Sequence, residues 1–257
     1  MSAAMSRFQG KVVVVTGGAS GIGEAVAKRF ASEGASVLLA DKDVDGLKRV
    51  AGEIGVHAAT RETDVSDEAA CEALVAFAVE RFGRIDVVVN DAGVDHLARI
   101  DEGPFSDFTR VIETDLYGVV HISRAAIAEL RKTKGTVINV SSASGLGGDW
   151  NHAAYCAAKG AVTNFTRAFA MDEAKNGVRV NAVNPSLTYT PFTEGMKEQP
   201  DLVAKFEERI PMGRGAEVDD ISGVVAFLAS EDARYITGVN LPVDGGLSAS
   251  NGQPALS

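Results

Sequence analysis

Cysteine and histidine are scarce, and this scarcity limits the chemistry that the chain can support. The cysteines are Cys71 and Cys156, and four histidines are scattered along the 257 residues. Zinc sites and redox motifs need such residues at close, regular spacing, and the sequence has none of these spacings. We therefore expect no metal site, and we expect a soluble protein of a reducing, cytoplasmic compartment.

Positive charge and long apolar segments are also lacking. Lysine and arginine number 25 against 35 aspartate and glutamate residues, which gives a net charge of −10. Binding to a phosphate backbone depends on clustered basic residues, and the sequence has no such cluster. No apolar run has the length of a membrane span, and the first residues, MSAAMSRFQGK, lack the apolar centre of a signal peptide. These absences argue against nucleic acid and membrane as partners.

The chain instead repeats one pattern, in which a short run rich in valine or isoleucine is followed by a turn and a longer helical stretch. Near-continuous runs of this kind are typical of strands covered on both faces, as in a parallel sheet with helical crossovers. Strands are expected at 11–16, 36–41, 58–64, 85–90, 135–142, 178–183 and 238–243. The pattern predicts an α/β fold, a single doubly wound domain of Rossmann type over 1–257, with about seven parallel strands and helices on both faces.

Helices are expected between these strands. One begins near Ile22, one covers 44–53, one runs from a cap at Ser66 or Asp67 to Phe82, and a long helical region covers about 105–134. The least regular part is about 186–215, which contains three of the seven prolines. A long segment of this kind in a compact domain is more often a binding loop than a simple connection, so we expect a substrate lid there.

The first valine run leads directly into the glycine-rich stretch TGGASGIGEAV. Its G-x-x-x-G-x-G spacing differs from the usual dinucleotide fingerprint, but the physical reason for the glycines is the same. They allow a sharp turn and a close approach to a pyrophosphate, and the helix that follows offers free N–H groups and a positive dipole end. The candidate cofactor contacts in this turn are Gly17, Ser20, Gly21, Ile22 and Gly23.

Asp41 ends the second predicted strand, where the adenosine ribose of a bound dinucleotide is expected. A carboxylate at this position accepts hydrogen bonds from both ribose hydroxyls and repels a 2′-phosphate. Lys42 complicates this interpretation because a neighbouring cation could tolerate the phosphate. We expect NAD(H) rather than NADP(H).

With these features in place, the sequence resembles the classical short-chain dehydrogenase/reductase family over nearly its whole length. The matching stretches, in order along the chain, are TGGASGIG (16–23), DV (64–65), NDAG (90–93), SS (141–142), YCAAK (155–159) and NPSLTYT (184–190). Several motifs in the right order form a specific signal, whereas any one of them is weak. The resemblance implies a hydride-transferring enzyme. A dinucleotide sensor without enzymatic activity would typically have lost Tyr155 or Lys159.

The resemblance also implies further cofactor contacts. In such enzymes the residues that match Asp64, Val65, Asn90 and Gly93 lie against the adenine and ribose, and the stretch 185–190 holds the nicotinamide amide. The residues concerned are Asp64, Val65, Asn90, Gly93, Pro185, Thr188 and Thr190, together with Tyr155 and Lys159.

Tyr155 and Lys159 stand four residues apart and therefore share one face of a helix. Oxidation of an alcohol by hydride transfer requires loss of the hydroxyl proton, and an unperturbed tyrosine, with a pKa near 10, is a poor base at neutral pH. A cation one helical turn away, with the positive nicotinamide ring, favours the phenolate. The family pattern places the serine that hydrogen-bonds the substrate oxygen at Ser142 rather than at Ser141.

Three positions depart from the family pattern. The fourth catalytic position, usually an asparagine, is Asp115, whose carboxylate is expected to alter the pKa values of the site. The usual second asparagine of NNAG is Asp91, and the usual glycine after Pro185 is Ser186. None of these departures removes the set of Ser142, Tyr155 and Lys159.

The substrate pocket is expected to include residues 94–96, 143–144 and the stretch GGDWNH at 147–152. His96, His152 and Trp150 are each open to two interpretations, as pocket contacts or as ordinary surface or packing residues. The acidic Asp95 and Asp149 argue against a highly anionic substrate.

The stretches SGLGGDW, YCAAKGAV, NPSL, PVDGG (242–246) and NGQP (251–254) resemble the meso-2,3-butanediol dehydrogenases and acetoin reductases of the family. This implies NAD(H) and a small secondary alcohol or ketone, such as a vicinal diol or hydroxyketone. The alternative is a 3-oxoacyl carrier-protein reductase, which would ordinarily use NADPH and a basic docking patch. Members of the family are usually tetramers, which implies a homotetramer here.

Overall fold

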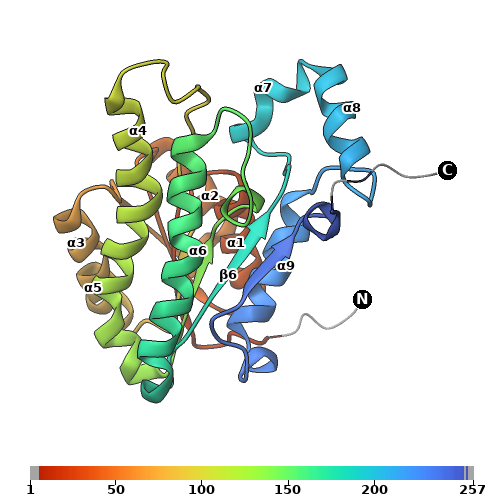
Figure 1. Cartoon of the computed structure of the whole chain (residues 1–257). Helices are drawn as coiled ribbons and strands as arrows, with labels where there is room; N and C mark the ends of the chain where they lie inside the picture. Colours follow the sequence, from red (N-terminus) through yellow and green to blue (C-terminus); the bar gives the residue numbers. More distant parts are fainter. Residues whose placement is uncertain (1–5, 252, 254–257) are drawn as a thin grey trace.

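The structure is a computed structural model in which residues 6–251 and 253 are described. The predicted domain limits of 1–257 and part of the motif at 251–254 therefore lie outside the described residues. Within the described part, the chain forms one seven-stranded sheet with helices on both of its faces (Figure 1).

The sheet is parallel throughout, with the strand order β3-β2-β1-β4-β5-β6-β7. The strands are β1 (Val12–Thr16), β2 (Ser36–Asp41), β3 (Ala58–Glu62), β4 (Val87–Asn90), β5 (Thr136–Val140), β6 (Arg179–Pro185) and β7 (Asn240–Val243). All residues of β1, β4 and β5 are buried, because helices cover both faces of these central strands. The predicted doubly wound parallel sheet is confirmed.

The helices connect successive strands. They are α1 (Gly21–Ser32), α2 (Val44–Ile54), α3 (Glu68–Phe82), α4 (Phe105–Ile112), α5 (Gly118–Thr133), α6 (Ala153–Glu173), α7 (Glu194–Lys197), α8 (Pro200–Arg209) and α9 (Val218–Ala229). Short turns of other helical types include η1 (Gly55–His57), η2 (Glu113–Tyr117), η3 (Ala143–Gly145) and η5 (Pro191–Thr193). Asp67 caps α3, since its side chain accepts hydrogen bonds from the N–H groups of Ala69 and Ala70.

Two hydrophobic cores lie on opposite faces of the sheet. On one face, residues of α1, α2 and α9, such as Phe30, Leu47 and Ile221, pack on β1 and β2. On the other, residues of α3, α5 and α6, such as Leu74 and Ile122, pack on the opposite side of the same strands. Packing on both faces of the sheet fixes the positions of the strand ends, and with them the geometry of the site.

The long helical region predicted at 105–134 is interrupted in the structure. A π-helical turn, η2, separates α4 from α5, and it turns the buried Asp115 towards the sheet end. Single π turns inside helices often lie at functional sites. The predicted irregular segment at 186–215 is also more ordered than expected, because it contains η5, α7 and α8, with Pro191 and Pro200 at the starts of η5 and α8.

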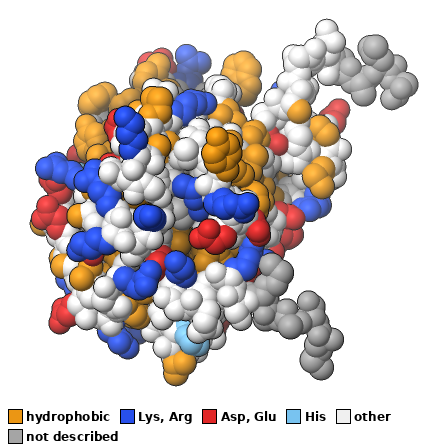
Figure 2. Space-filling view, turned by 90° about the horizontal axis from the view of Figure 1, so that it is seen from below, with side chains coloured by type: hydrophobic (Ala, Val, Ile, Leu, Met, Phe, Trp, Pro, Cys, Tyr) orange, Lys and Arg blue, Asp and Glu red, His pale blue; other side chains and the backbone are white. Residues whose placement is uncertain are grey.

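Figure 2 shows the end of the molecule seen from below Figure 1, where lysine and arginine side chains lie among hydrophobic ones with some aspartate and glutamate. The Asp86 carboxylate stabilises the start of β1, because it accepts a hydrogen bond from Val12 N at 3.0 Å and pairs with Lys11 and Arg84.

Among the described helices, none combines the length and the apolar character that a bilayer span requires.

Strand order reverses between β1 and β4, because the chain proceeds outward from β1 to β3 on one side and from β4 to β7 on the other. The loops after β1 and β4 therefore diverge at their carboxyl ends and leave a crevice, which is where ligands bind in open α/β sheets. Helices α7 and α8, within the segment 186–215, stand at this end of the molecule, at the upper right of Figure 1.

Candidate active site

A cavity of about 500 Å³ opens at the carboxyl ends of the central strands. It extends from the glycine-rich turn after β1, past the ends of β2, β4 and β5, to the loop after β6. The predicted site residues on its surface are Gly17, Ser20, Gly21, Ile22, Asp41, Asp64, Val65, Gly93, Asp115, Ser142, Tyr155, Lys159, Pro185, Thr188 and Thr190. The structure thus brings together most of the residues that the sequence singles out.

The glycine-rich turn has no room for side chains at two of its glycines. A Cβ on Gly17 would lie 2.8 Å from Ala92 N, and a Cβ on Gly23 would lie 2.2 Å from Gly17 O. Ser20, the residue before α1, gives the helix no side-chain cap, and Ser20, Gly21 and Ile22 at the start of the helix line the cavity. This arrangement fits a pyrophosphate, since bare backbone N–H groups and the helix dipole both favour an anion.

Asp41 lies on the cavity surface at the end of β2 and also stabilises the turn. Its carboxylate accepts hydrogen bonds from Ala19 N at 3.2 Å and from Asp43 N at 3.0 Å. Lys42 points to another carboxylate, since its Nζ lies 3.1 Å from Asp64 Oδ2. The cation that complicated the cofactor prediction is therefore partly neutralised by Asp64.

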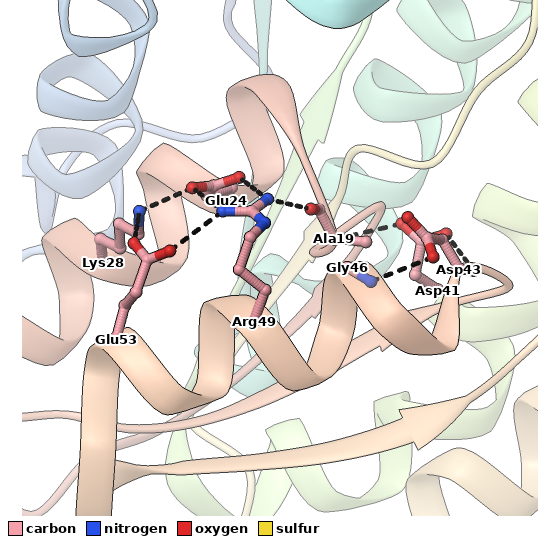
Figure 3. A network of polar contacts seen from close by, with 8 residues as sticks. All are labelled: Ala19, Glu24, Lys28, Asp41, Asp43, Gly46, Arg49 and Glu53. Atoms are coloured by element: carbon pink, nitrogen blue, oxygen red, sulfur yellow. Dashed lines mark hydrogen bonds and ion pairs between the residues drawn. The ribbon is translucent and has the colours of Figure 1, made fainter.

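A network of charged side chains supports the same turn from outside the cavity (Figure 3). Arg49 on α2 donates to Ala19 O at 2.9 Å and to both carboxylate oxygens of Glu24, in the first turn of α1. Lys28 and Glu53 complete the network. Ala19 is thus bonded through its N–H to Asp41 and through its carbonyl to Arg49. The two cations also offset Glu24, a negative charge close to where an anion would bind.

Two of the predicted cofactor contacts do not lie on the cavity surface. Gly23 packs beneath the turn, against Gly17. Asn90 is buried in the sheet end, where its Nδ2 donates to Asn139 Oδ1 at 2.9 Å and to Ser123 Oγ at 3.3 Å. Gly23 therefore supports the site through packing, and Asn90 supports it through hydrogen bonds at the sheet end.

Ser142, Tyr155 and Lys159 meet at one side of the cavity. Tyr155 and Lys159 occupy successive turns of α6, and Lys159 Nζ lies 5.5 Å from the centre of the Tyr155 ring. Ser142 follows β5, and its side chain is close enough to Tyr155 to lower the pKa of the phenol. Ser141 faces the other way, where its hydroxyl donates to the backbone oxygen of Lys159 at 3.0 Å. The geometry therefore favours Ser142 over Ser141 as the serine that reaches a substrate.

Asp115 contacts Lys159 in the interior of the site. Its Oδ2 lies 3.3 Å from Lys159 Nζ, and its Oδ1 accepts a hydrogen bond from Val94 N at 2.7 Å. Lys159 also donates to Val140 O at 3.2 Å. Burial lowers the pKa of Lys159. The charges of Asp115 and Tyr155 raise this pKa, and together they outweigh burial, so that the net pKa lies above its ordinary value. Lys159 is therefore a permanently charged ammonium at neutral pH.

The pKa of Tyr155 is raised above its ordinary value of 10.0. Burial is the largest cause, and the charges of Asp115 and Asp95 act in the same direction. Lys159 and Ser142 oppose this shift, as the sequence predicted for Lys159, but they are outweighed. The protein's own groups therefore keep the phenol protonated at neutral pH.

Asp91, the second departure from the family pattern, lies on the cavity surface against Gly23. Burial raises the pKa of Asp91 to about 7, while the charge of Lys159 lowers it and those of Asp41 and Asp115 raise it. The charges of two carboxylates, Asp115 and Asp91, thus act on Lys159 and raise its pKa.

Beyond the lysine, the loop after β6 forms the opposite side of the cavity. Thr188 bridges to Ala216, and Tyr189 on the same segment donates its hydroxyl proton to Glu207 Oε1 on α8 at 2.8 Å. Cavity residues that sequence reasoning missed are Ala40, Asp43, Thr63, Ala92, Thr114 and Val140, whereas Pro191, Phe192 and Thr193 belong to the segment 186–215 that was expected to cover the site. The only sign of the missed residues in the sequence is that most of them adjoin a predicted site residue in the chain.

The predicted substrate contacts lie partly elsewhere. Val94 is on the cavity surface, whereas Trp150 is 87% exposed and neither lines the cavity nor packs in the core. His152 faces Asp95, with His152 Nε2 and Asp95 Oδ2 3.1 Å apart. His96 lies beside Asp107, with 3.7 Å between the imidazole and the carboxylate.

Comparison with known proteins gives consistent matches over nearly the whole chain. Residues 17–248 match a family model described as enoyl-(acyl carrier protein) reductase. The chain is 48% identical over 251 residues to the meso-2,3-butanediol dehydrogenase of Serratia marcescens, a match that covers 97% of this chain and 99% of that enzyme.

Solved structures agree with the fold. The crystal structure of levodione reductase superposes with a TM-score of 0.91 at 36% identity, covering 95% of this chain and 100% of that one. The 3-ketoacyl-(acyl-carrier-protein) reductase of Brucella melitensis, solved with NADH, gives a TM-score of 0.87 at 39% identity, covering 94% and 99%.

Proposed function

This chain belongs to the short-chain dehydrogenase/reductase family, and from that premise we propose the reaction it catalyses and the residues that carry it out. It is an oxidoreductase whose cofactor is NAD. The family resemblance inferred from the motifs is confirmed. The proposed substrate is a small vicinal diol or hydroxyketone, such as 2,3-butanediol or acetoin, and the 48% identity to a meso-2,3-butanediol dehydrogenase supports it.

The observation that carries this proposal is that Ser142, Tyr155 and Lys159 lie on the same cavity as the glycine-rich turn. The turn would bind the pyrophosphate, Asp41 the adenosine ribose, and the segment 185–190 the nicotinamide end. When bound, NAD⁺ accepts a hydride from the carbon that bears the alcohol. The residues then have only to orient the substrate and move one proton.

Tyr155 is the proposed proton donor and acceptor. Because its pKa is raised, Tyr155 carries a proton at neutral pH and is suited to donate it to a carbonyl oxygen during ketone reduction. In alcohol oxidation the same oxygen accepts the hydroxyl proton. Ser142 hydrogen-bonds the substrate oxygen as negative charge develops there, and the charged Lys159 stabilises the phenolate.

Asp115 takes a role different from that of the family's asparagine. Its carboxylate fixes the Lys159 ammonium at 3.3 Å and holds the loop after β4 through Val94 N. We assign it as a positioning residue rather than as a proton carrier, since its hydrogen-bonding and ion-pair partners both belong to the protein.

A lid over the cavity is proposed for 186–215. Residues at its start, including Thr190 and Phe192, lie on the cavity surface. The segment is attached at its base by the bridge between Thr188 and Ala216. In Figure 1, α7 and α8 stand apart from the layers that cover the sheet, as a closing element requires.

A homotetramer in the cytoplasm is proposed from the same family membership. Apolar side chains at the surface of α6 support association, because Met171 is 75% exposed and lies close in the chain to the stacked pair of Phe165 and Phe169. Light scattering of the purified protein distinguishes a tetramer from a monomer.

A 3-oxoacyl carrier-protein reductase is the second candidate, favoured by the 39% identity to the Brucella enzyme. One panel of steady-state rates separates the two. Acetoin, diacetyl, the butanediol stereoisomers and an acetoacetyl thioester are each assayed with both cofactors. The proposal expects the highest kcat/KM for a butanediol or acetoin with NAD(H), and a preference for the thioester with NADPH would overturn it.

A further inference from the structure

Both ring nitrogens of His152 face oxygen atoms that only accept hydrogen bonds. Nδ1 lies 2.9 Å from Trp150 O, and Nε2 lies 3.1 Å from Asp95 Oδ2. A neutral imidazole has one N–H and could make only one of these bonds. The two contacts form together only when His152 is an imidazolium. The shift of its pKa agrees, because the hydrogen bond with Asp95 raises the pKa of His152 above 6.5.

His152 lies where the helix that carries Tyr155 begins. It is the residue directly before α6, and its carbonyl accepts a hydrogen bond from Cys156 N at 2.7 Å. The ring centroids of His152 and Tyr155 are 6.1 Å apart, and the two rings are arranged edge to face. Asp95 belongs instead to the loop after β4. The ion pair therefore connects that loop to the first turn of α6, and Ala98 N adds a second link to Asn151 O at 2.9 Å.

The charges around the pair also bear on Tyr155. Asp95 is among the groups that raise the pKa of Tyr155, and the imidazolium offsets its charge. Asp149 lies 3.7 Å from His152 Nδ1 and accepts a hydrogen bond from the Ser144 hydroxyl at 3.2 Å. Ser144 N in turn donates to Ser142 Oγ at 3.1 Å. A chain of polar contacts thus runs from His152 to the proposed catalytic serine.

The remaining charged groups near the pair come from α4. Arg110 donates to Asp95 O at 3.3 Å, and Asp107 lies 3.7 Å from the imidazole of His96. These contacts position the loop through its backbone and through His96. The charge of His96, beside Asp95 in the loop, also lowers the pKa of the Asp95 carboxylate, but among the described contacts only the one with His152 is an ion pair of that carboxylate.

We propose that His152, as an imidazolium paired with Asp95, is a positioning residue that fixes Tyr155 and Ser142 for proton transfer. This inference rests on the proposed function, since it assigns the pair a role only if Tyr155 exchanges the substrate proton. Neither residue lies on the cavity surface, so both act through α6 and the loop at 144–152. At alkaline pH, His152 loses a proton and one of its two hydrogen bonds. In ketone reduction, which uses the protonated Tyr155, the rate then falls above the pKa of His152.

The activity test compares His152→Gln, Asp95→Asn, the double variant and a matched control, His57→Gln, which changes an exposed histidine in η1. With the best substrate of the panel, we expect kcat to fall about tenfold in each single variant, because misplacing a proton-transfer group by a fraction of an ångström has effects of this order. The loss of rate attributed to His152 at alkaline pH should disappear. The double variant should be no worse than either single variant, and His57→Gln should match the parent protein.

Binding of NADH, measured by fluorescence, checks folding and should change less than twofold in every variant. A second readout needs no substrate. In NMR titrations the pKa of His152 should lie above the ordinary histidine value of 6.5 and fall towards that value in Asp95→Asn. Parent-like kcat in His152→Gln, additive losses in the double variant, or an unshifted His152 pKa would overturn the inference. Retained activity in Tyr155→Phe would instead overturn the proposed function, so the two failures are distinguishable.

Discussion

Lys159 Nζ and Asp115 Oδ2 lie 3.3 Å apart, with the lysine 4% exposed and the aspartate fully buried. A buried ion pair is costly to desolvate, and removal of one member leaves the other charge uncompensated. The pair lies between the π turn η2 and the second turn of α6. It therefore connects two helices at the point where the proposed proton-transfer residues meet.

The first prediction concerns this pair. In Asp115→Asn we expect the free energy of unfolding to fall by about 3 kcal/mol, the order found when a buried ion is left unpaired. Urea denaturation of the variant and of the parent protein measures the difference. An unchanged stability would show that the ion pair is compensated by other contacts.

Asp115→Asn should also shift the profile of kcat/KM against pH. The Asp115 charge raises the pKa of Tyr155, so its removal should lower that pKa. Alcohol oxidation, which needs the deprotonated phenol, should then rise with pH at a lower pH than in the parent protein. The profile of kcat/KM against pH checks the sign, and a shift to higher pH would contradict the assignment of the base.

How far the sequence predicts the fold depends on how local the signal is. The apolar strands β1, β2 and β4 are recognisable because both of their faces are buried. Strand β3, with the sequence AATRE, four half-buried residues and an exposed Glu62, gives a weak signal because it lies at the sheet edge. The π turn in the middle of the 105–134 region could not be predicted, since it depends on tertiary packing around Asp115.

The site divides in the same way. The glycine-rich turn and the YCAAK motif are local, so sequence alone places Gly17, Tyr155 and Lys159 correctly at one cavity. The pair of Asp95 and His152 is separated by 57 residues, and only the fold brings its members together. In the segment 186–215, which looks irregular in the sequence, Pro191 and Pro200 instead begin η5 and α8, because proline is favoured at the first position of a helix.

Another prediction tests the cofactor preference. Asp41→Ala should reduce the ratio of kcat/KM with NAD⁺ to that with NADP⁺ by about tenfold, because it removes one charge-assisted hydrogen bond to the ribose. Part of the loss with NAD⁺ should come from the turn, since Asp41 also accepts from Ala19 N. Asp45→Asn is a control that should leave the ratio unchanged, because Asp45 is exposed, pairs with Lys48 and does not line the cavity. A ratio unchanged by Asp41→Ala would count against the ribose contact.

The network of Figure 3 predicts an effect on cofactor affinity from outside the cavity. Arg49→Ala removes the hydrogen bond to Ala19 O and leaves Glu24, in the first turn of α1, with less positive charge nearby. We expect the Kd for NADH to rise about threefold to tenfold, while kcat changes little, because a negative charge at a helix N-terminus opposes an anion. Lys48→Ala, which removes an exposed ion pair with Asp45, should leave the Kd unchanged. Equal effects of the two substitutions would show that net charge alone is responsible.

The account depends most on Tyr155 as the group that exchanges the substrate proton, and Tyr155→Phe tests it with the removal of a single oxygen. Steady-state turnover and NADH binding are measured on the same preparation. We predict that kcat falls by about 100- to 10,000-fold, the range for loss of a general acid or base, while the Kd for NADH stays within about threefold of the parent value. A variant that binds NADH normally and keeps most of its turnover would contradict the account.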